Sequence, residues 1–237
     1  MCSDDLSPSL RRHVDGAFAR PHILTAVSAF AAGLPAGSRV LDAGAGAAPF
    51  RELFGAARCH YTTSDWANSV HPEARVADVV APIDELPLAD GSFDAVLCTE
   101  VLEHVEDPPA ALRELRRVLV PGGAVLITVP FVGELHEEPY DFFRFTPHSL
   151  RSLLLAAGFE RVAVDPLGGA FTVGAHLTRN WVTLTGGAGP VARVVAPVLW
   201  RLGPVVAALD RFDRRRILTA GYAVRATAAG PAAGRPV

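Results

Sequence analysis

The stretch Val40-Leu41-Asp42-Ala43-Gly44-Ala45-Gly46-Ala47-Ala48-Pro49-Phe50 decides the fold of this chain. A short apolar run ends at Asp42 and is followed by a turn that contains Gly44 and Gly46. This pattern is typical of a strand that leads through a tight turn into a helix. Because glycine has no Cβ, such a turn brings the backbone close to a ligand. We therefore expect a ligand site where this strand ends.

The turn differs from a dinucleotide-binding fingerprint in two respects. Pro49 stands where that fingerprint has its third glycine, and Asp42 places an acid beside the expected pyrophosphate. A carboxylate at this point suits a ligand that carries an ammonium group. A nucleoside with a charged amino-acid tail fits better than NAD, and S-adenosylmethionine is the obvious candidate.

The composition indicates one globular α/β domain. The chain has 237 residues, of which 50% are hydrophobic and 20% are charged, and its net charge is −3. This length can bury one full core, and the charge gives no general reason to bind nucleic acid. The three cysteines, Cys2, Cys59 and Cys98, have no metal-site spacing. With no secretory segment and no apolar run of spanning length, we expect a cytoplasmic protein.

Strand and helix patterns alternate between residues 38 and 165. Strands are predicted at 38–43, 58–64, 74–78, 93–99, 124–129 and 159–165, and helices at 22–34, 47–56, 107–120, 146–157 and 170–184. The alternation predicts a doubly wound, mostly parallel, Rossmann-like sheet. Residues 217–226 alternate like a strand, and we expect them to complete a seven-stranded sheet as an antiparallel edge. Ligands of such sheets lie at the carboxyl ends of the strands.

The segments outside this core are less regular. Residues 1–37 are predicted to form an N-terminal helical lid on a domain at 38–227, and 228–237 to form a disordered tail. Residues 166–216 are interpreted as a helical insertion before the last strand. Within it, 190–216 is apolar and arginine-containing, so it could lie on a membrane or pack as a lid or homodimer surface. Its prolines favour packing.

Two further acids stand at predicted strand ends. Asp65 follows Asp42 by 23 positions and can accept hydrogen bonds from ribose hydroxyls. Asp78 follows the third predicted strand and could accept from an adenine amino group, with the N–H of Val79 facing the ring. Each acid alone could equally be a turn residue. Three acids at successive strand ends beside a glycine turn form a more specific pattern.

Longer pieces extend the pattern in the expected order. They are VLDAGAG (40–46), ADV (77–79), LPLADGSFDAVLCTEVLEHVEDP (86–108), LRRVLVPGGAVLITVP (115–130) and AAGFE (156–160). With these pieces, the chain resembles the class I S-adenosylmethionine-dependent methyltransferases, specifically the small-molecule group with an LEHV segment. The resemblance covers about residues 38–165. It implies methyl transfer to an oxygen (or nitrogen) atom of a small acceptor, with S-adenosylhomocysteine as product.

The resemblance also implies which residues hold the cofactor. These residues lie at or just after strand ends and are Asp42, Gly44, Ala45, Gly46, Asp65, Trp66, Asp78, Val79, Thr99 and Glu100. The first four would hold the methionine part, Asp65 the ribose, the next three the adenine, and the last two would lie near the sulfonium. The chain reads Thr99-Glu100-Val101-Leu102 where base-methylating relatives have an NPPY-type tetrapeptide, which disfavours a nucleic-acid partner.

The loop at residues 131–145 is expected to form the acceptor side. His136 is the first candidate for a general base, and Tyr140 and Arg144 could orient the acceptor. Alternatively, an Asp141–Arg144 pair fixes the shape of the loop, and we favour this interpretation for Arg144. His104 is a lesser catalytic candidate, because Glu103 and His104 are expected to be structural in this group.

Several alternatives remain open from the sequence. Phe18 and Arg20 could reach the acceptor from the N-terminal segment. His136, Glu137, Glu138 and Asp141 could bind a metal, but loop acids are usually solvated, and we expect no metal. The fold could also bind S-adenosylmethionine for a reaction other than methylation, or serve as a non-catalytic scaffold. The intact glycine turn and strand-end acids argue against a scaffold.

Overall fold

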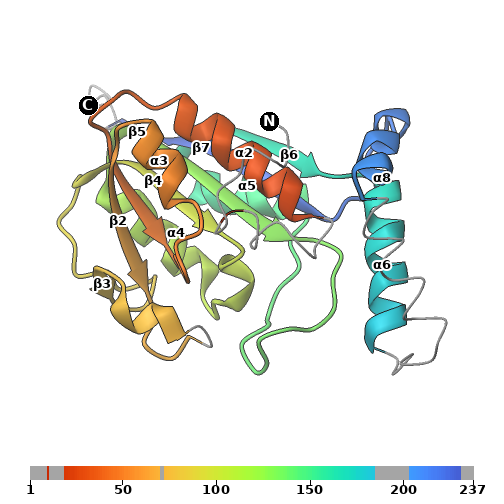
Figure 1. The fold of residues 1–237 in the computed structure, drawn as a ribbon. Helices are drawn as coiled ribbons and strands as arrows, with labels where there is room; N and C mark the ends of the chain where they lie inside the picture. Colours follow the sequence, from red (N-terminus) through yellow and green to blue (C-terminus); the bar gives the residue numbers. More distant parts are fainter. Residues whose placement is uncertain (1–9, 11–18, 70–71, 185–202, 231–237) are drawn as a thin grey trace.

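The structure is a computed structural model, and it describes residue 10 and residues 19–69, 72–184 and 203–230 (Figure 1). Phe18, which was predicted to face the acceptor, lies outside these residues. So do residues 190–202 of the apolar stretch predicted as a lid, dimer or membrane surface. Within the described ranges, no helix is both long and apolar enough to cross a membrane.

A seven-stranded sheet forms the centre of the molecule, with the strand order β3-β2-β1-β4-β5-β7-β6. The strands are β1 (Arg39–Ala43), β2 (His60–Asp65), β3 (Val79–Val80), β4 (Phe93–Thr99), β5 (Leu119–Pro130), β6 (Phe159–Leu167) and β7 (Gly221–Ala228). The first five strands are parallel to one another, and β7 runs antiparallel to both β5 and β6. The predicted doubly wound sheet with an antiparallel last strand is confirmed.

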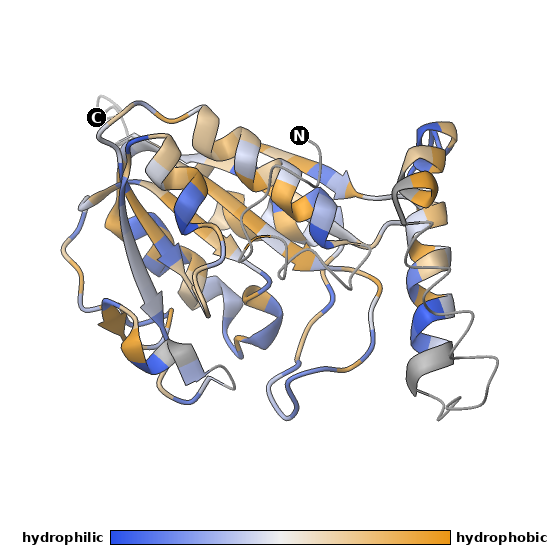
Figure 2. Ribbon diagram, in the orientation of Figure 1, coloured by the Kyte–Doolittle hydropathy of each residue, from blue (hydrophilic) through white to orange (hydrophobic). Residues whose placement is uncertain are grey.

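Helices cover both faces of the sheet because successive side chains of each buried strand point in opposite directions. On β1, Val40 joins one buried cluster and Leu41 the other. The cluster of Val40 includes side chains of α2 (Arg20–Ala32) and α3 (Arg51–Ala56). The cluster of Leu41 includes side chains of α4 (Pro108–Val118) and α5 (Pro147–Ala156). Figure 2 shows hydrophobic residues concentrated on the central strands of the sheet.

Two helices begin where capping residues predict. The Asp107 side chain accepts a hydrogen bond from the N–H of Ala110 at the start of α4. Thr146 and Ser149 form a reciprocal capping box at the start of α5. Each cap satisfies N–H groups that the first helical turn leaves unpaired, and a proline follows each cap. These two boundaries therefore follow from local sequence.

The prediction of a strand at 74–78 was wrong. Residues Pro72–Val76 form a 3-10 helix, η2, and the third strand consists only of Val79–Val80. This strand lies at the sheet edge and pairs with β2 alone, so little ladder is available to extend it. The predicted helix at 47–56 begins only at Arg51, because Ala48 has a φ of 49°, which is incompatible with a helix.

The C-terminal strand also differs from its prediction. β7 is not an edge strand but lies between β5 and β6, which makes β6 the edge. It extends to Ala228, and the N–H of Ala229 donates to the carbonyl of Gly158. The tail predicted to be disordered from residue 228 is therefore ordered through its first two residues, because β6 and the turn before it supply hydrogen-bond partners.

Between β6 and β7, the described residues are 168–184 and 203–220, and helices account for many of them. These helices are α6 (Ala170–Leu184), α8 (Gly203–Leu209) and the 3-10 helix η4 (Asp210–Phe212). Figure 1 shows α6 and α8 side by side at one end of the sheet, away from the helices that cover its faces. Asp210 is buried, and its carboxylate accepts hydrogen bonds from the N–H groups of Gly169 and Phe171 at the start of α6.

Candidate functional site

A pocket of about 1250 Å³ lies at the carboxyl ends of β1, β2, β4 and β5. Because these strands are parallel neighbours, the segments that follow them meet at one edge of the sheet. The glycine turn, the end of β2, the end of β4 and the loop after β5 all contribute to its wall. The pocket therefore occupies the position that the strand-end pattern predicts.

The glycine turn after β1 is held tightly against β2. Gly44 and Gly46 have φ values of 77° and 51°, in the left-handed region that favours glycine. The N–H groups of Gly44 and Ala45 donate to the carbonyl of Ser64 at 2.8 and 3.0 Å. A Cβ added to Gly44 would lie 2.3 Å from Cγ2 of Val101. Gly44 is thus required by the close approach of the segment after β4, and the turn presents its surface to the pocket.

Asp65 joins the turn to the end of β2. One of its carboxylate oxygens accepts from the N–H of Gly46 at 2.6 Å, and the other accepts from the N–H of Trp66 at 2.7 Å. A carboxylate has about four acceptor positions, so two of those on Asp65 stay available to a ligand. Asp65, Trp66 and the turn all line the pocket, so the structure brings these predicted residues together.

Asp42 is not among the residues that line the pocket. It is buried behind the turn, where the hydroxyl of Tyr61 donates to one of its carboxylate oxygens and the other has no partner among the described residues. Burial raises the pKa of Asp42 to about 7, although the Tyr61 hydrogen bond opposes this shift. The structure therefore separates Asp42 from the cavity that the predicted ammonium group would enter.

Asp78 and Val79 also lie outside the pocket lining. The carboxylate of Asp78 accepts from the N–H and the hydroxyl of Thr63, both at 2.8 Å, and these hydrogen bonds lower its pKa. The wall is formed instead by residues 81–85, which sequence reasoning missed. The acids Asp84 and Glu85 shortly after a strand end are the signal that could have identified this segment.

Thr99 and Glu100 line the pocket at the end of β4, as predicted. Glu100 has a φ of 54°, and its N–H donates to the carbonyl of Thr128 on β5. Its side chain accepts a hydrogen bond of 2.9 Å from the Thr128 hydroxyl. Burial nevertheless raises the pKa of Glu100. The sheet thus holds this acid in a fixed position in the pocket wall.

The loop after β5 reaches the pocket through His136 and Tyr140. The Tyr140 ring packs edge-on against Trp66, with ring centroids 5.3 Å apart. Arg144 does not line the pocket, and its guanidinium makes two hydrogen bonds to Asp141 and one to the carbonyl of Glu134. This pair holds the pKa of Asp141 at about 2. The geometry therefore matches the interpretation that Arg144 fixes the shape of the loop.

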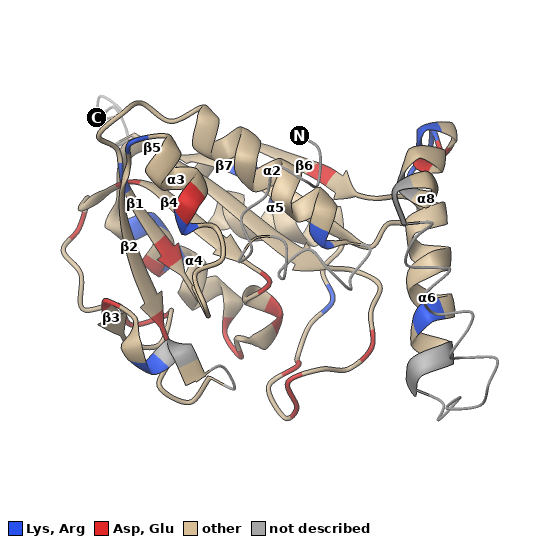
Figure 3. Cartoon of the chain, in the orientation of Figure 1, with Lys and Arg blue, Asp and Glu red and all other residues tan. Residues whose placement is uncertain are grey.

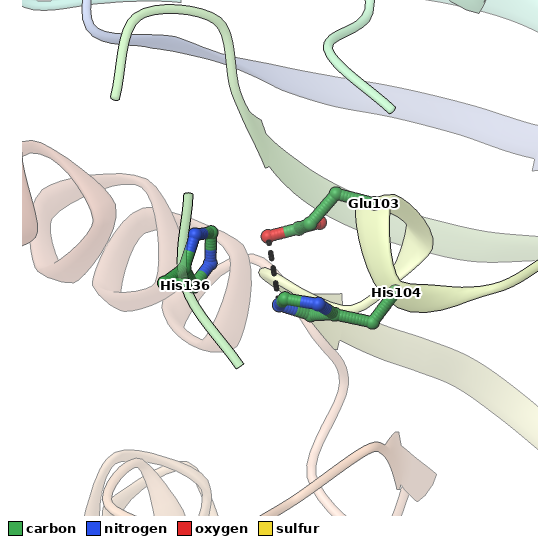
Figure 4. Close-up of side chains that lie close together, drawn as sticks. All are labelled: Glu103, His104 and His136. Carbon is green, nitrogen blue, oxygen red and sulfur yellow. Dashed lines mark ion pairs between the residues drawn. The ribbon is translucent and has the colours of Figure 1, made fainter. Parts of the chain in front are cut away.

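Glu103, His104 and His136 form a cluster in the pocket wall (Figure 4). Glu103 comes from η3 (Leu102–His104), is completely buried, and neither of its carboxylate oxygens has a hydrogen-bond partner among the described residues. Burial raises its pKa well above the usual range and lowers that of His104. The two imidazole rings have centroids 4.7 Å apart. Sequence reasoning named both histidines separately but gave no reason for them to meet Glu103.

Acidic residues predominate in the pocket wall. Among the described lining residues, Arg20 is the only arginine, and the acids are Asp65, Asp84, Glu85, Glu100, Glu106, Glu134 and Glu137. Figure 3 shows acidic residues in the loops below the sheet, on the strand ends and on the loop after β5. This excess of negative charge favours a ligand with positive charge. Arg20 enters the wall from the first turn of α2, while the buried residues of α2 pack in the core.

Comparisons with known proteins agree with this architecture. A family model described as a methyltransferase domain matches residues 11–164. A ubiquinone biosynthesis O-methyltransferase from Xanthomonas axonopodis pv. citri is 36% identical over 104 residues, which cover 40% of this chain and 44% of the relative. A malonyl-[acyl-carrier protein] O-methyltransferase from Erwinia pyrifoliae is 39% identical over 104 residues, which cover 42% of this chain and 40% of the relative. The chain thus matches less than half the length of these curated relatives.

Solved structures share the fold over most of the chain. A SAM dependent methyltransferase from Archaeoglobus fulgidus superimposes with a TM-score of 0.58 at 18% identity, covering 90% of this chain and 95% of that protein. The [4+2]-cyclase SpnF superimposes with a TM-score of 0.57 at 22% identity, covering 89% of this chain and 81% of that protein. At this level of identity the similarity establishes the fold alone.

Proposed function

The chain belongs to the methyltransferase domain family, and from this premise we propose that it transfers the methyl group of S-adenosylmethionine to an oxygen (or nitrogen) atom of a small-molecule acceptor. One observation carries the proposal. In a chain of this family, the glycine turn and the carboxylate of Asp65 meet at the strand-end pocket. We assign the methyltransferase domain to residues 38–227, with an N-terminal lid at 1–37 and an insertion at 166–216.

The pocket suits the cofactor in charge and shape. Asp65 would accept from the ribose hydroxyls with its two available acceptor positions, and the ring of Trp66 offers an apolar face for the adenine. The surface of the glycine turn would hold the methionine part. The acidic wall would stabilise the positive sulfonium and ammonium groups by several partly screened interactions. Thr99 and Glu100 would lie closest to the reacting centre.

The acceptor would enter between the loop after β5, the first turn of α2 and the second turn of α6. His136, Tyr140, Arg20 and His176 line this part of the pocket. Glu134 connects the loop to α6, because its carboxylate lies 3.2 Å from Nε2 of His176. The curated relatives described above are both named as O-methyltransferases, which supports oxygen as the methylated atom.

S-Adenosylmethionine supplies an already activated methyl group, so the protein must mainly align the acceptor and exclude water. As the new oxygen–carbon bond forms, the carbon–sulfur bond breaks and the acceptor hydroxyl loses its proton. His104 can take part in this proton transfer, because burial lowers its pKa and keeps it neutral near pH 7. Its Nδ1 lies 2.7 Å from the carbonyl of Tyr140, which leaves Nε2 as the basic nitrogen. His136 is the second candidate.

Calorimetric titration with S-adenosylmethionine and S-adenosylhomocysteine tests the proposal. We expect micromolar binding of both compounds by the wild-type chain and markedly weaker binding by Asp65→Ala. A panel of phenols and carboxylic acids, analysed for a mass gain of one methylene group, then tests the acceptor class. Absence of binding to either compound would overturn the proposal.

A further inference from the structure

We propose that Glu103, His104 and His136 form a binding site for one divalent transition-metal ion in the wall of the pocket. Each residue offers one ligand atom, and these atoms all lie within 4.8 Å of one another. Figure 4 shows the Glu103 carboxylate facing the His104 ring, with the His136 ring on the other side of the carboxylate oxygen. This inference concerns the protein's own side chains and does not depend on the proposed methyl transfer.

The spacing of Glu103 and His104 fits a shared ion better than it fits a hydrogen bond. Nε2 of His104 lies 3.8 Å from Oε1 of Glu103, which is beyond hydrogen-bonding distance. Ligand atoms bonded to one zinc-like ion at about 2.1 Å lie roughly 3 to 4.2 Å from each other. The gap between these two atoms therefore has the width that a bridging cation requires, and a ligand atom of His136 lies within 4.8 Å of both.

The other nitrogen of each imidazole is engaged by the backbone. Nδ1 of His104 lies 2.7 Å from the carbonyl of Tyr140, and Nδ1 of His136 lies 3.2 Å from the carbonyl of Glu134. A carbonyl only accepts hydrogen bonds, so each Nδ1 carries the hydrogen and each Nε2 keeps its lone pair. Histidine ligands of metals are commonly oriented by this arrangement.

Glu103 supplies the strongest argument for a cation. Its side chain is completely buried, and both carboxylate oxygens are without partners among the described residues. A buried carboxylate without a partner is unfavourable, so in native proteins such groups are protonated, paired or used to coordinate metals. The neighbouring Glu100 is half-buried and adds a second negative charge near Glu103. A bound cation would relieve both effects.

The elements that carry the three ligands are fixed to each other without the metal. The carbonyl of Glu103 accepts from the N–H groups of Phe142 and Phe143, which ties η3 to the loop after β5. The N–H of His136 donates to Asp141, which Arg144 holds in turn. The ligand geometry is thus preorganised by backbone contacts, as a metal site of useful affinity requires.

The ligand set indicates the class of ion. One carboxylate with two imidazoles is typical of zinc, iron(II) and related first-row ions, whereas Mg²⁺ and Ca²⁺ prefer oxygen ligands. Because His104 and His136 line the pocket and Glu103 lies behind them, the open coordination positions would face the pocket. If methyl transfer occurs as proposed, the ion would replace His104 as the group that promotes proton loss, because it occupies the Nε2 lone pair of His104. An acceptor hydroxyl bound to the ion would release its proton to solvent more readily.

Titration of CoCl2 into the metal-free full chain, prepared without a histidine tag, tests the site. Visible absorption and calorimetry should report one Co²⁺ ion per chain. Glu103→Gln and His136→Ala should each weaken Co²⁺ binding at least 100-fold. His148→Ala should bind as wild type does, because His148 lies on the exposed side of α5, outside the pocket lining. S-Adenosylmethionine binding, measured separately without metal, reports on the cofactor site.

Two results would overturn the proposal. The first is the lack of any Co²⁺ or Zn²⁺ binding below millimolar concentration by the folded wild-type chain. The second is binding that Glu103→Gln and His136→Ala leave unchanged, because the ion would then lie elsewhere. Thermal unfolding provides the folding control, since Gln fits the space of Glu103 without its charge. If Glu103→Gln does not fold, the half-exposed His136 still gives a decisive variant.

Discussion

The carboxylate of Asp65 accepts a hydrogen bond of 2.6 Å from the N–H of Gly46, so the end of β2 holds the turn that follows β1. The two segments that form the proposed cofactor site are therefore one hydrogen-bonded unit. Loss of Asp65 removes the acceptor of the Gly46 N–H as well as the proposed acceptor of the ribose hydroxyls.

Asp65→Ala should weaken S-adenosylhomocysteine binding about 10- to 100-fold, because one or two hydrogen bonds to a charged group are lost at about 1.5 kcal/mol or more each. Calorimetry measures this change. Asp165→Ala is the matched control, since Asp165 lies on β6 with its side chain about half exposed. Equal affinities of Asp65→Ala and wild type would remove the ribose assignment.

Gly44→Ala should destabilise the protein by about 2 to 4 kcal/mol, which combines an unfavourable positive φ with overpacking against Val101. Denaturant unfolding measures the change. The double variant Gly44→Ala/Val101→Ala should recover the overpacking part and retain the backbone part. No recovery in the double variant would show that contact with Val101 is not the reason for glycine.

The Asp141–Arg144 pair should make the loop after β5 sensitive to acid. The folded pKa of Asp141 is about 2, below its usual value of 3.8, so the pair stabilises the protein fully above pH 4. This stabilisation is lost as the pH falls from 4 to 2. Asp141→Asn should therefore lower the free energy of unfolding by about 1 to 2 kcal/mol at pH 7 and by much less at pH 2.5. The value at pH 7 allows for solvent screening at the partly exposed Arg144. A pH-independent difference between the two unfolding curves would contradict this account.

Tyr140→Ala should weaken cofactor binding a few-fold, because the contact of Tyr140 with Trp66 orients the ring proposed to face the adenine. Aromatic pairs of this kind contribute about 0.5 to 1.5 kcal/mol. Tyr140→Phe keeps the ring and should bind the cofactor as wild type does. If Tyr140→Phe instead raises the KM of an acceptor, the hydroxyl contacts the acceptor.

Activity measurements distinguish a general base from a metal ligand at His136. If His136 is the general base, His136→Ala should lower kcat about 100-fold, while Glu103→Gln should retain most of the wild-type kcat. If His136 is a metal ligand, both variants should lower kcat to a similar level. Added Co²⁺ or Zn²⁺ should then raise the kcat of the wild type only. Full activity of His136→Ala would rule out both roles and leave His136 as a residue that shapes the loop.

Local signals in the sequence predicted the central sheet well. The apolar runs of β1 and β4, the caps at Asp107 and Thr146, and α6 were located to within a few residues. These features depend on neighbours in the chain, which sequence patterns report directly. The short β3 was misplaced because an edge strand of two residues, Val79–Val80, has too few positions to show a period.

Long-range relationships were harder to predict. The place of β7 between β5 and β6 depends on pairing across the sheet, which a local alternating pattern does not encode. Asp42 and Asp78 were predicted to face the ligand, but Tyr61 and Thr63 of the neighbouring strand occupy their carboxylates. Strand-end position predicts that an acid lies near the pocket, whereas the direction of its side chain depends on the adjacent strand.

The carboxylate of Asp210 reaches back about 40 residues to cap the first turn of α6, and the N–H groups of Gly169 and Phe171 bind it. Together with the hydrogen bond from the N–H of Ala170 to Asp213, this contact ties the start of α6 to the residues that precede β7. A change of chain length between residues 184 and 203 would therefore leave the start of α6 tied to the residues that precede β7. Doubling that length would cost only about 0.6 kcal/mol in loop-closure entropy. Asp210 thus links the last two strands of the sheet through the helices that lie between them in the chain.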